Sequence, residues 1–255
     1  MTRRINRHSA GRIGLLLLAA LLLPLSLPAA DEDAATEAPA ALLDGLSLSA
    51  TVSYDSRYVL YAYSLTEHLY HASVNAYLPI NDRWSAWAGS WYGTLDDGTY
   101  RELDLYAGFD AVIGSHFSAG GGWSLFNYLK VPYPSDDSAN ELMAHVTATA
   151  GPFALRLSDQ YDFSAEGNLV RLILTGTQPL CDHVTLIASI DYGYALDYYI
   201  EGNAPNHVIC RLSLPLKVSE AVTVKPFVAH STPLKAIKEY EVERTYWGVH
   251  VDYAF

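Results

Sequence analysis

The sequence predicts an all-β protein, a closed antiparallel transmembrane β-barrel of about twelve strands. Three observations predict this fold. Apolar and polar residues alternate through most of the chain after residue 46, as they do along strands whose side chains point to opposite faces in turn. The chain holds 19 Tyr and five Trp, residues that favour membrane–water interfaces. It also ends on an alternating aromatic segment, Trp247 to Phe255.

The amino-terminal residues predict export from the cytoplasm. Four basic residues, Arg3, Arg4, Arg7 and Arg12, precede an apolar stretch at 13–27 and small residues before Asp31. This pattern is typical of a secretory signal peptide over 1–30. The alternative is a membrane anchor, but the stretch of about 15 residues is shorter than the roughly 20 that a spanning helix needs. The Ala/Pro/acidic segment 31–45 predicts a flexible periplasmic tail, and 46–255 the barrel.

Alternating segments separated by turn residues mark the predicted strands. They cover 46–57, 68–79, 83–93, 100–113, 115–128, 139–150, 152–163, 167–178, 182–194, 206–217, 219–230 and 243–255. Tight turns alternate with longer connections at 57–67, 130–139, 195–205 and 231–242. Short turns at one end and long loops at the other predict a barrel with both termini in the periplasm.

Two details of the strand pattern are less regular. Pro215 and Pro226 fall inside predicted strands, and since proline has no N–H for the ladder, we expect bulges or local shifts there. In the segment 83–93, two facings remain open: either Trp87 and Trp91 face lipid, or Trp84 does so with its alternating neighbours.

The carboxy-terminal segment predicts how the barrel closes. Its alternate residues Trp247, Val249, Val251, Tyr253 and Phe255 would form one apolar face. An outer-membrane barrel must pair its last strand with its first, so that no edge remains. This ending resembles the assembly signal of bacterial outer-membrane proteins, which predicts the barrel assembly machinery and outer-membrane lipid as partners. A soluble β-sandwich with an exposed last strand is the alternative.

Two stretches resemble a known family. They are Ser49–Tyr58, and the region from Tyr100-Arg-Glu-Leu-Asp-Leu-Tyr-Ala-Gly-Phe109 to Tyr133-Pro134 and Glu141. Both are similar to TorF-type porins, a proteobacterial family of exported barrels. The resemblance covers about a third of the chain and departs from the family after Arg57, where Tyr58 replaces a common glycine. It implies an outer-membrane barrel, and it implies no substrate because the family's role is itself poorly defined.

Charge and cysteine content limit the partners. Without the four arginines of the predicted signal peptide, the chain carries 12 Lys+Arg against 28 Asp+Glu, a net charge of −16. An acidic chain does not suit nucleic acid as a partner. Cys181 would lie in a turn and Cys210 outward on a strand, so we expect two free thiols. We expect no cofactor and no metal site.

The barrel interior is the predicted functional site. If apolar residues face lipid, the opposite face supplies the pore lining, namely Asp55, Arg57, Glu102, Asp104, Asp110, Arg156, Arg171, Asp191, Arg211, Lys225, His250 and Asp252. Most of the basic residues lie on later strands than the acidic residues of the first and fourth strands. We therefore expect Arg156, Arg171 and Arg211 to face Glu102, Asp104 and Asp110 across the lumen, as opposed charges do in selective pores.

This lining predicts an outer-membrane channel for passive diffusion of small polar solutes, with a weak preference for cations. One alternative is a sealed structural or adhesive barrel that works through loops such as 130–139, with ion pairs bridging the interior. Another is a barrel hydrolase. The sequence contains no Gly-x-Ser-x-Gly stretch, and His71, His145 and His250 would be lumenal and scattered. We therefore assign no catalytic residue.

Overall fold

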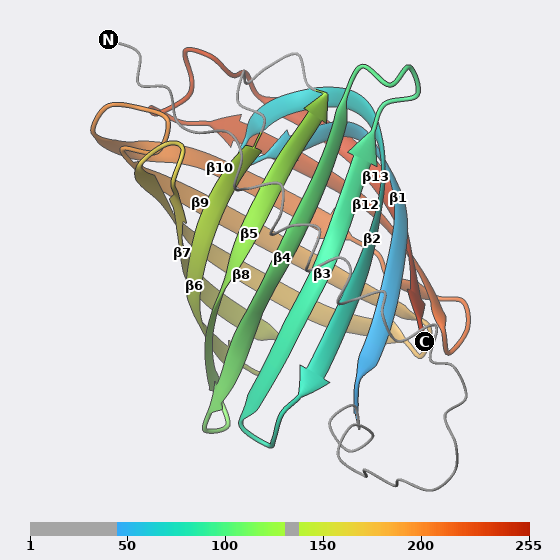
Figure 1. Cartoon of the computed structure of the whole chain (residues 1–255). Helices are drawn as coiled ribbons and strands as arrows, with labels where there is room; N and C mark the ends of the chain where they lie inside the picture. Colours follow the sequence, from blue (N-terminus) through green and yellow to red (C-terminus); the bar gives the residue numbers. More distant parts are fainter. Residues whose placement is uncertain (1–44, 131–137) are drawn as a thin grey trace, which may run out of the picture. The chain divides into compact units, whose positions relative to one another are not determined.

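The computed structural model describes residues 45–130 and 138–255, which form a closed antiparallel β-barrel (Figure 1). The predicted signal peptide, residues 31–44 of the predicted tail and loop residues 131–137 lie outside the described residues. None of the described residues belongs to a helix long and apolar enough to cross a membrane.

The barrel has twelve strand positions among the described residues, as predicted. The segments Asn203–Ser213 and Leu216–Lys217 share the tenth position, because each pairs with Val184–Leu196 on one side and with Val222–Pro233 on the other. The strands are β1 (Ser47–Leu60), β2 (Tyr63–Pro79), β3 (Trp84–Thr94), β4 (Arg101–Ile113), β5 (Phe117–Lys130), β6 (Ser138–Ala150), β7 (Phe153–Asp162), β8 (Gly167–Cys181), β9 (Val184–Leu196), β10 (Asn203–Ser213), β11 (Leu216–Lys217), β12 (Val222–Pro233) and β13 (Arg244–Ala254).

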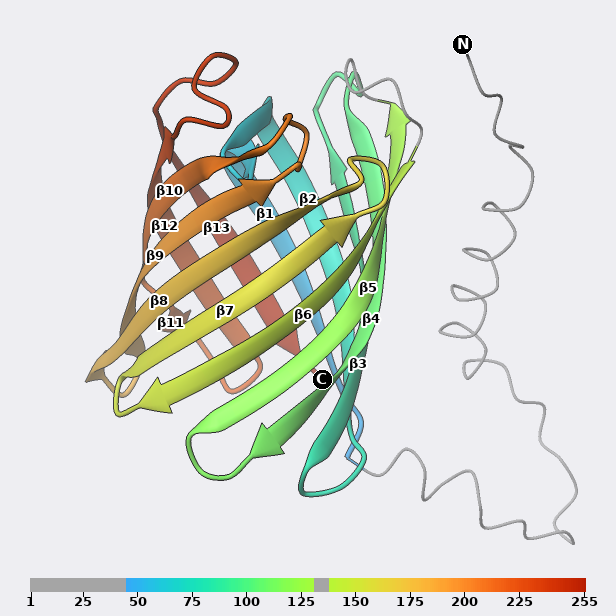
Figure 2. The ribbon, with the colours of Figure 1, turned by 90° about the vertical axis from the view of Figure 1, so that its left-hand side faces the viewer.

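The barrel closes where its last strand meets its first. β13 pairs antiparallel with β1 from Ser49↔Ala254 to Asp55↔Gly248, and with β12 on its other side. Figure 2 shows the strands inclined around the barrel, with the carboxy terminus near the end where β1 begins. We call this end the base and the end with the longer connections the mouth. Closure leaves no row of unpaired backbone groups, which an apolar surrounding requires.

The two faces of the sheet differ as the alternation predicts. The outer face exposes large apolar side chains, including Val52, Phe109 and Leu157. The inner face holds polar groups, such as Ser53 and Glu102, which are 5% and 0% exposed. This is the reverse of a water-soluble barrel, since large contiguous apolar surfaces are unfavourable in water.

The first predicted long loop is wrong. Instead of a connection over 57–67, β1 and β2 continue to a two-residue turn, Tyr61-Ala62, whose φ angles are 50° and 70°. The ladder extends through Arg57↔Glu67 and absorbs one shift of register between Tyr58 and Val59. The predicted loops 195–205 and 231–242 are also shorter than expected, since strand pairing continues into both. The extended β1–β2 hairpin is long enough to bend over the mouth (Figure 2).

The prolines affect the ladder at one place. Pro215 separates β10 from β11, as the expected irregularity requires. Pro226 does not disturb β12, which keeps its register with β13 at Pro226↔Val249. On its other side, β12 faces the interruption at Leu214-Pro215, where Leu214 N–H donates to the Pro226 carbonyl at 3.0 Å. Pro215 and Pro226, which both lack a backbone N–H, therefore lie at the same interruption of the ladder.

The structure also settles the facing of the three tryptophans in β3. Trp84 is 46% exposed on the outer face. Trp91 points inward, where its Nε1 donates to His71 Nδ1 at 3.0 Å. The Trp87 ring also lies on the inner side, over Gly108 and Gly122, at positions where any Cβ would collide with it. The glycines make room for this ring.

The closing strand generates a prediction about assembly. Tyr253 and Phe255 are exposed, and their rings meet edge to face with centroids 4.7 Å apart. Phe255 N donates to the Leu48 carbonyl at 3.0 Å. Changing both to Asp should lower the folded, membrane-inserted fraction, because a charge on a lipid face costs about 2–4 kcal/mol at the midplane and less near the interface. Heat-modifiable electrophoretic mobility measures that fraction. The matched control, Tyr253→Phe with Phe255→Tyr, should fold normally, and equal folding of the Asp variant would contradict the prediction.

Candidate functional site in the barrel interior

The charged side chains of the inner wall pair mainly with their neighbours. Arg171 on β8 donates from Nε to Asp191 Oδ2 on β9 at 3.0 Å, and its guanidinium forms an ion pair with the same carboxylate. Lys225 on β12 pairs in the same way with Asp252 on β13. His145 Nε2 on β6 lies 3.1 Å from Asp110 Oδ1 on β4. These contacts run along the wall.

The observed contacts therefore differ from the expected rows of opposite charge across the lumen. Arg171 pairs with Asp191 on the next strand, and Arg211 lies over the Phe227 ring at 3.6 Å. Only Arg156 interacts electrostatically with one of the three acids expected opposite it, Asp110. Neighbouring strands offer closer partners than the far wall, so a cross-lumen arrangement would have to leave those partners unpaired.

One predicted lining residue lies elsewhere. Arg57 pairs with Glu67, whose side chain is 59% exposed, and donates to Ser64 Oγ at 2.9 Å. The next residue, Tyr58, enters the interior instead and packs its ring 5.4 Å from that of Trp91. The ladder omits Ser56 and His68, and His68 has a positive φ of 57°. Simple alternation from the start of the strand could not reveal this irregularity before Tyr58.

Two histidines converge on one carboxylate near the β1–β13 seam. Asp55 Oδ1 lies 3.1 Å from His250 Nε2 on β13, and its Oδ2 lies 3.3 Å from His71 Nε2 on β2. The two imidazole rings meet edge to face at 5.3 Å. The sequence predicts all three residues as lumenal but scattered, and only the pairing of β1 with both neighbours brings them together.

A second group, nearer the mouth, combines acids with tyrosines. Glu141 accepts hydrogen bonds from Tyr198 Oη at 3.0 Å and Tyr61 Oη at 3.4 Å, and Asp162 accepts one from Tyr199 Oη at 2.7 Å. Burial raises the pKa of Tyr198 and of Tyr199, and the neighbouring carboxylates add to the effect. Both phenols therefore stay protonated and act as donors at physiological pH.

Glu102 and Asp104 belong to the same acidic region. They are 0% and 7% exposed, and Glu102 accepts a hydrogen bond from Tyr100 Oη. Glu102 Oε1 and Asp104 Oδ1 are buried without a hydrogen-bond partner among the described residues. Neither carboxylate forms an ion pair with a described Arg or Lys, so the interior beside the start of β4 is acidic.

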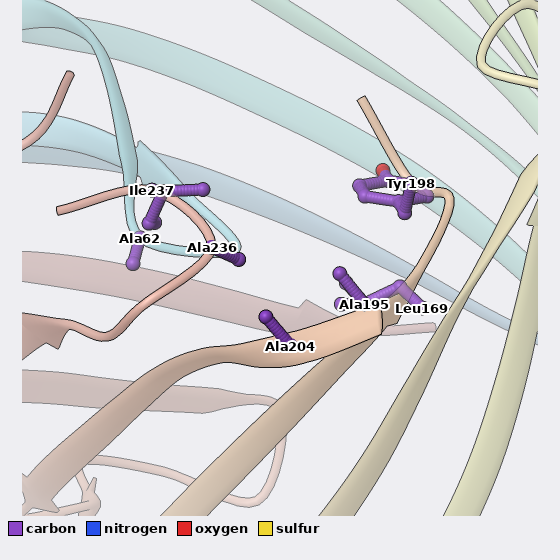
Figure 3. Packing of buried hydrophobic residues seen from close by; sticks show 7 residues of the cluster. All are labelled: Ala62, Leu169, Ala195, Tyr198, Ala204, Ala236 and Ile237. Atoms are coloured by element: carbon purple, nitrogen blue, oxygen red, sulfur yellow. The ribbon is translucent and has the colours of Figure 1, made fainter. Parts of the chain in front are cut away.

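The hairpin tip closes this region from above. Tyr61 reaches across the interior, where its Oη accepts a hydrogen bond from Gln160 Nε2 on β7 at 2.9 Å. Its neighbour Ala62 belongs to a buried apolar cluster at the mouth (Figure 3). The members of this mouth cluster are Ala62, Leu169, Ala195, Tyr198, Ala204, Ala236 and Ile237. Sequence reasoning missed Tyr61, Tyr198 and Tyr199, since it placed all three in loops of unknown course.

A cavity remains below the tip. It has a volume of about 310 Å³ and is lined by Asp55, His71, Trp91, Asp104 and Tyr106, among others. A larger groove of about 790 Å³ lies on the outer face beside Phe109 and Trp123. The lining of that groove is apolar apart from Asp159. The paired charges of the inner wall lie on the other side of the sheet, so the inner cavity is the candidate site.

Solved structures similar to this chain are outer-membrane barrels. The translocator domain of the autotransporter NalP from Neisseria meningitidis aligns with 85% of this chain and 93% of its own, at 14% identity and a TM-score of 0.56. An outer-membrane channel from Pseudomonas putida F1 aligns over 82% and 95%, at 11% identity and 0.53. The KdgM porin in complex with oligogalacturonate aligns over 82% and 99%, at 13% identity and 0.52.

These likenesses define the class by its fold, a closed twelve-stranded barrel of the outer-membrane type. No family model matches the chain, and no curated protein matches it. The TorF-type resemblance therefore stays a prediction from the sequence.

The Arg171–Asp191 pair generates a stability prediction. The two side chains are 19% and 12% exposed, so Asp191→Asn should leave a poorly solvated guanidinium and lower the free energy of unfolding by roughly 1–3 kcal/mol, less than in a dry core. Urea unfolding of the barrel in lipid vesicles, followed by tryptophan fluorescence, measures the change. In the matched control, Glu220→Gln removes the exposed Lys217–Glu220 pair and should change little. Equal effects of the two variants would contradict the prediction.

Proposed function

We propose that the protein is a channel of the bacterial outer membrane for passive diffusion of small polar solutes. One observation carries the proposal: the ion pairs of the inner wall join strands on the same side, such as β8 with β9 and β12 with β13. Pairs that bridged the lumen would seal it, whereas pairs along the wall satisfy the charges and leave space between the walls. The proposal includes no catalytic activity.

The proposed location has independent support. The outer face is apolar, and the last strand presents Trp247, Val251, Tyr253 and Phe255 on it. Porins and channels are among the solved structures with a similar fold. We propose outer-membrane lipid as the surrounding medium, export through the predicted signal peptide, and insertion by the barrel assembly machinery.

In the conformation described here, side chains pack together at the mouth. The Tyr61-Ala62 tip and the connection after β12 meet in the mouth cluster, in which Ile237 is 0% exposed. We propose that solutes pass when this tip moves aside. The same packing favours a second candidate function, a sealed barrel that works through its loops.

Conductance in planar bilayers separates the two candidates. Loosening the mouth cluster with Ile237→Ser should raise the open-channel frequency or single-channel conductance, because a buried apolar contact that holds the tip is lost. Tyr240→Ser, in the same connection but 76% exposed, is the matched control and should behave like the wild type. If wild type and Ile237→Ser both insert and neither conducts, the sealed barrel replaces the channel.

Ion preference tests the lining. The mouth half holds Glu102, Asp104, Glu141 and Asp162, so we expect the wild type to prefer cations. Replacing Arg156, Arg171 and Arg211 by Glu should strengthen this preference, and replacing Glu102, Asp104 and Asp110 by Lys should reverse it. Reversal potentials in a salt gradient measure both, and the shifts should shrink as salt rises because charges are screened over about 8–10 Å. Unchanged reversal potentials in a conducting protein would show that the lining is misassigned.

A further inference from the structure

The residues Asp55, His71 and His250 have the composition and spacing of a metal site. One carboxylate oxygen of Asp55 and one ring nitrogen of each histidine lie within 4.8 Å of one another. The two nitrogen–oxygen distances are 3.1 and 3.3 Å. A tetrahedral ion with ligands about 2.0–2.1 Å away holds those ligands roughly 3.3–3.5 Å apart. Each histidine nitrogen is therefore already at about the ligand spacing from one oxygen of Asp55, Oδ1 for His250 and Oδ2 for His71. The remaining ligand atoms, within 4.8 Å of one another, would move closer around an ion.

The surroundings leave room for an open coordination position. Asp55 and His71 line the inner cavity of about 310 Å³, and Asp104 lines it too. Asp104 Oδ1 is buried without a hydrogen-bond partner in the described chain, and so is Ser53 Oγ. Ser53 lies opposite His71 on β2 and opposite His250 on β13. Two unpartnered acceptors beside this cluster suit an ion that carries water.

Arg211 does not occupy the carboxylate of Asp55. Arg211 interacts electrostatically with Asp55, but its guanidinium stacks on Phe227 at 3.6 Å and donates to Ser213 Oγ at 3.3 Å. Both oxygens of Asp55 therefore stay directed at the histidines. The side chain of Asp104 lines the same cavity and provides a further oxygen ligand nearby.

We propose that Asp55, His71 and His250 bind a divalent transition-metal ion of the zinc type on the inner wall of the barrel, with water in the position open to the cavity. Two imidazoles and one carboxylate are ligands that such ions prefer. The site goes beyond the channel function and does not depend on it. It differs from the absence of a metal site that the sequence predicts, because that prediction treated the histidines as scattered.

Trp91 gives the proposed site a distinctive signature. Its Nε1–H donates to His71 Nδ1, so the proton of a neutral His71 is on Nε2 and points at Asp55. An ion on Nε2 displaces that proton, and the neutral ring then carries it on Nδ1, where it opposes the Trp91 donor. Metal binding must therefore break the Trp91–His71 hydrogen bond.

Titration of the folded, chelator-treated barrel tests the proposal. Isothermal titration calorimetry with Zn²⁺ should show one site, and Co²⁺ should give the visible absorption of a tetrahedral complex. His250→Gln and Asp55→Asn should each weaken binding by more than about tenfold, since even supporting residues of metal sites contribute 10–100-fold. Trp91→Phe should tighten it by about two- to tenfold, the equivalent of one neutral hydrogen bond.

The matched control is His145→Gln, which removes a histidine that faces a carboxylate elsewhere on the inner wall, 3.1 Å from Asp110. It should leave Zn²⁺ binding unchanged. Heat-modifiable mobility verifies that every variant is folded before titration. The proposal is overturned if folded wild type binds no Zn²⁺, or if His250→Gln and Asp55→Asn bind as tightly as the wild type. A Trp91→Phe variant with weaker binding would overturn the proposed route through His71 Nε2.

Discussion

The pairing of β13 with β1 is the constraint on which the rest of the structure depends. In an apolar surrounding an unpaired backbone N–H or carbonyl costs several kcal/mol, so an open sheet edge there would be prohibitive. The pairing from Ser49↔Ala254 to Asp55↔Gly248 removes both edges at once. It also places His250 beside Asp55, so the seam that completes the barrel builds the most concentrated group of ligand atoms in the interior.

Inside the barrel, the position of each charge follows from what its neighbours offer. Some Arg and Lys side chains find carboxylates on a neighbouring strand, as Arg171 does with Asp191 and Lys225 with Asp252. Other carboxylates accept hydrogen bonds from tyrosine hydroxyls instead, as Glu141 does from Tyr198. The two arrangements meet at the mouth, because the Arg171 guanidinium lies 5.1 Å from the centre of the Tyr61 ring.

Two layers of side chains, one polar and one apolar, fill the mouth of the barrel. Its polar layer ties Tyr61 to Glu141 and Gln160 on the far wall, and its apolar layer buries Ala62 against the mouth cluster. Both layers depend on the one hairpin tip, whose two residues adopt positive φ angles. A non-glycine residue in that conformation costs of order 1 kcal/mol or more, and its packing contacts offset the cost. The tip is thus a single element through which the interior can be opened or kept closed.

The sequence by itself determined the elements whose physics is local. Alternation with period two determined the all-β class, most of the strand positions and which faces are apolar, because side chains alternate across a strand wherever its register is regular. The short turns and the aromatic last strand indicated closure.

Tertiary structure alone decided what depends on register and on distant contacts. The ladder leaves out Ser56 and His68, and beyond this point Tyr58 lies inward and Arg57 pairs with Glu67. Strand neighbours, not alternation, chose Asp191 as the partner of Arg171, and the seam gathered Asp55, His71 and His250. Loop residues such as Tyr61 and Tyr198 have no periodicity from which their course could be predicted. Their contacts arise only when the closed barrel brings its opposite walls within reach.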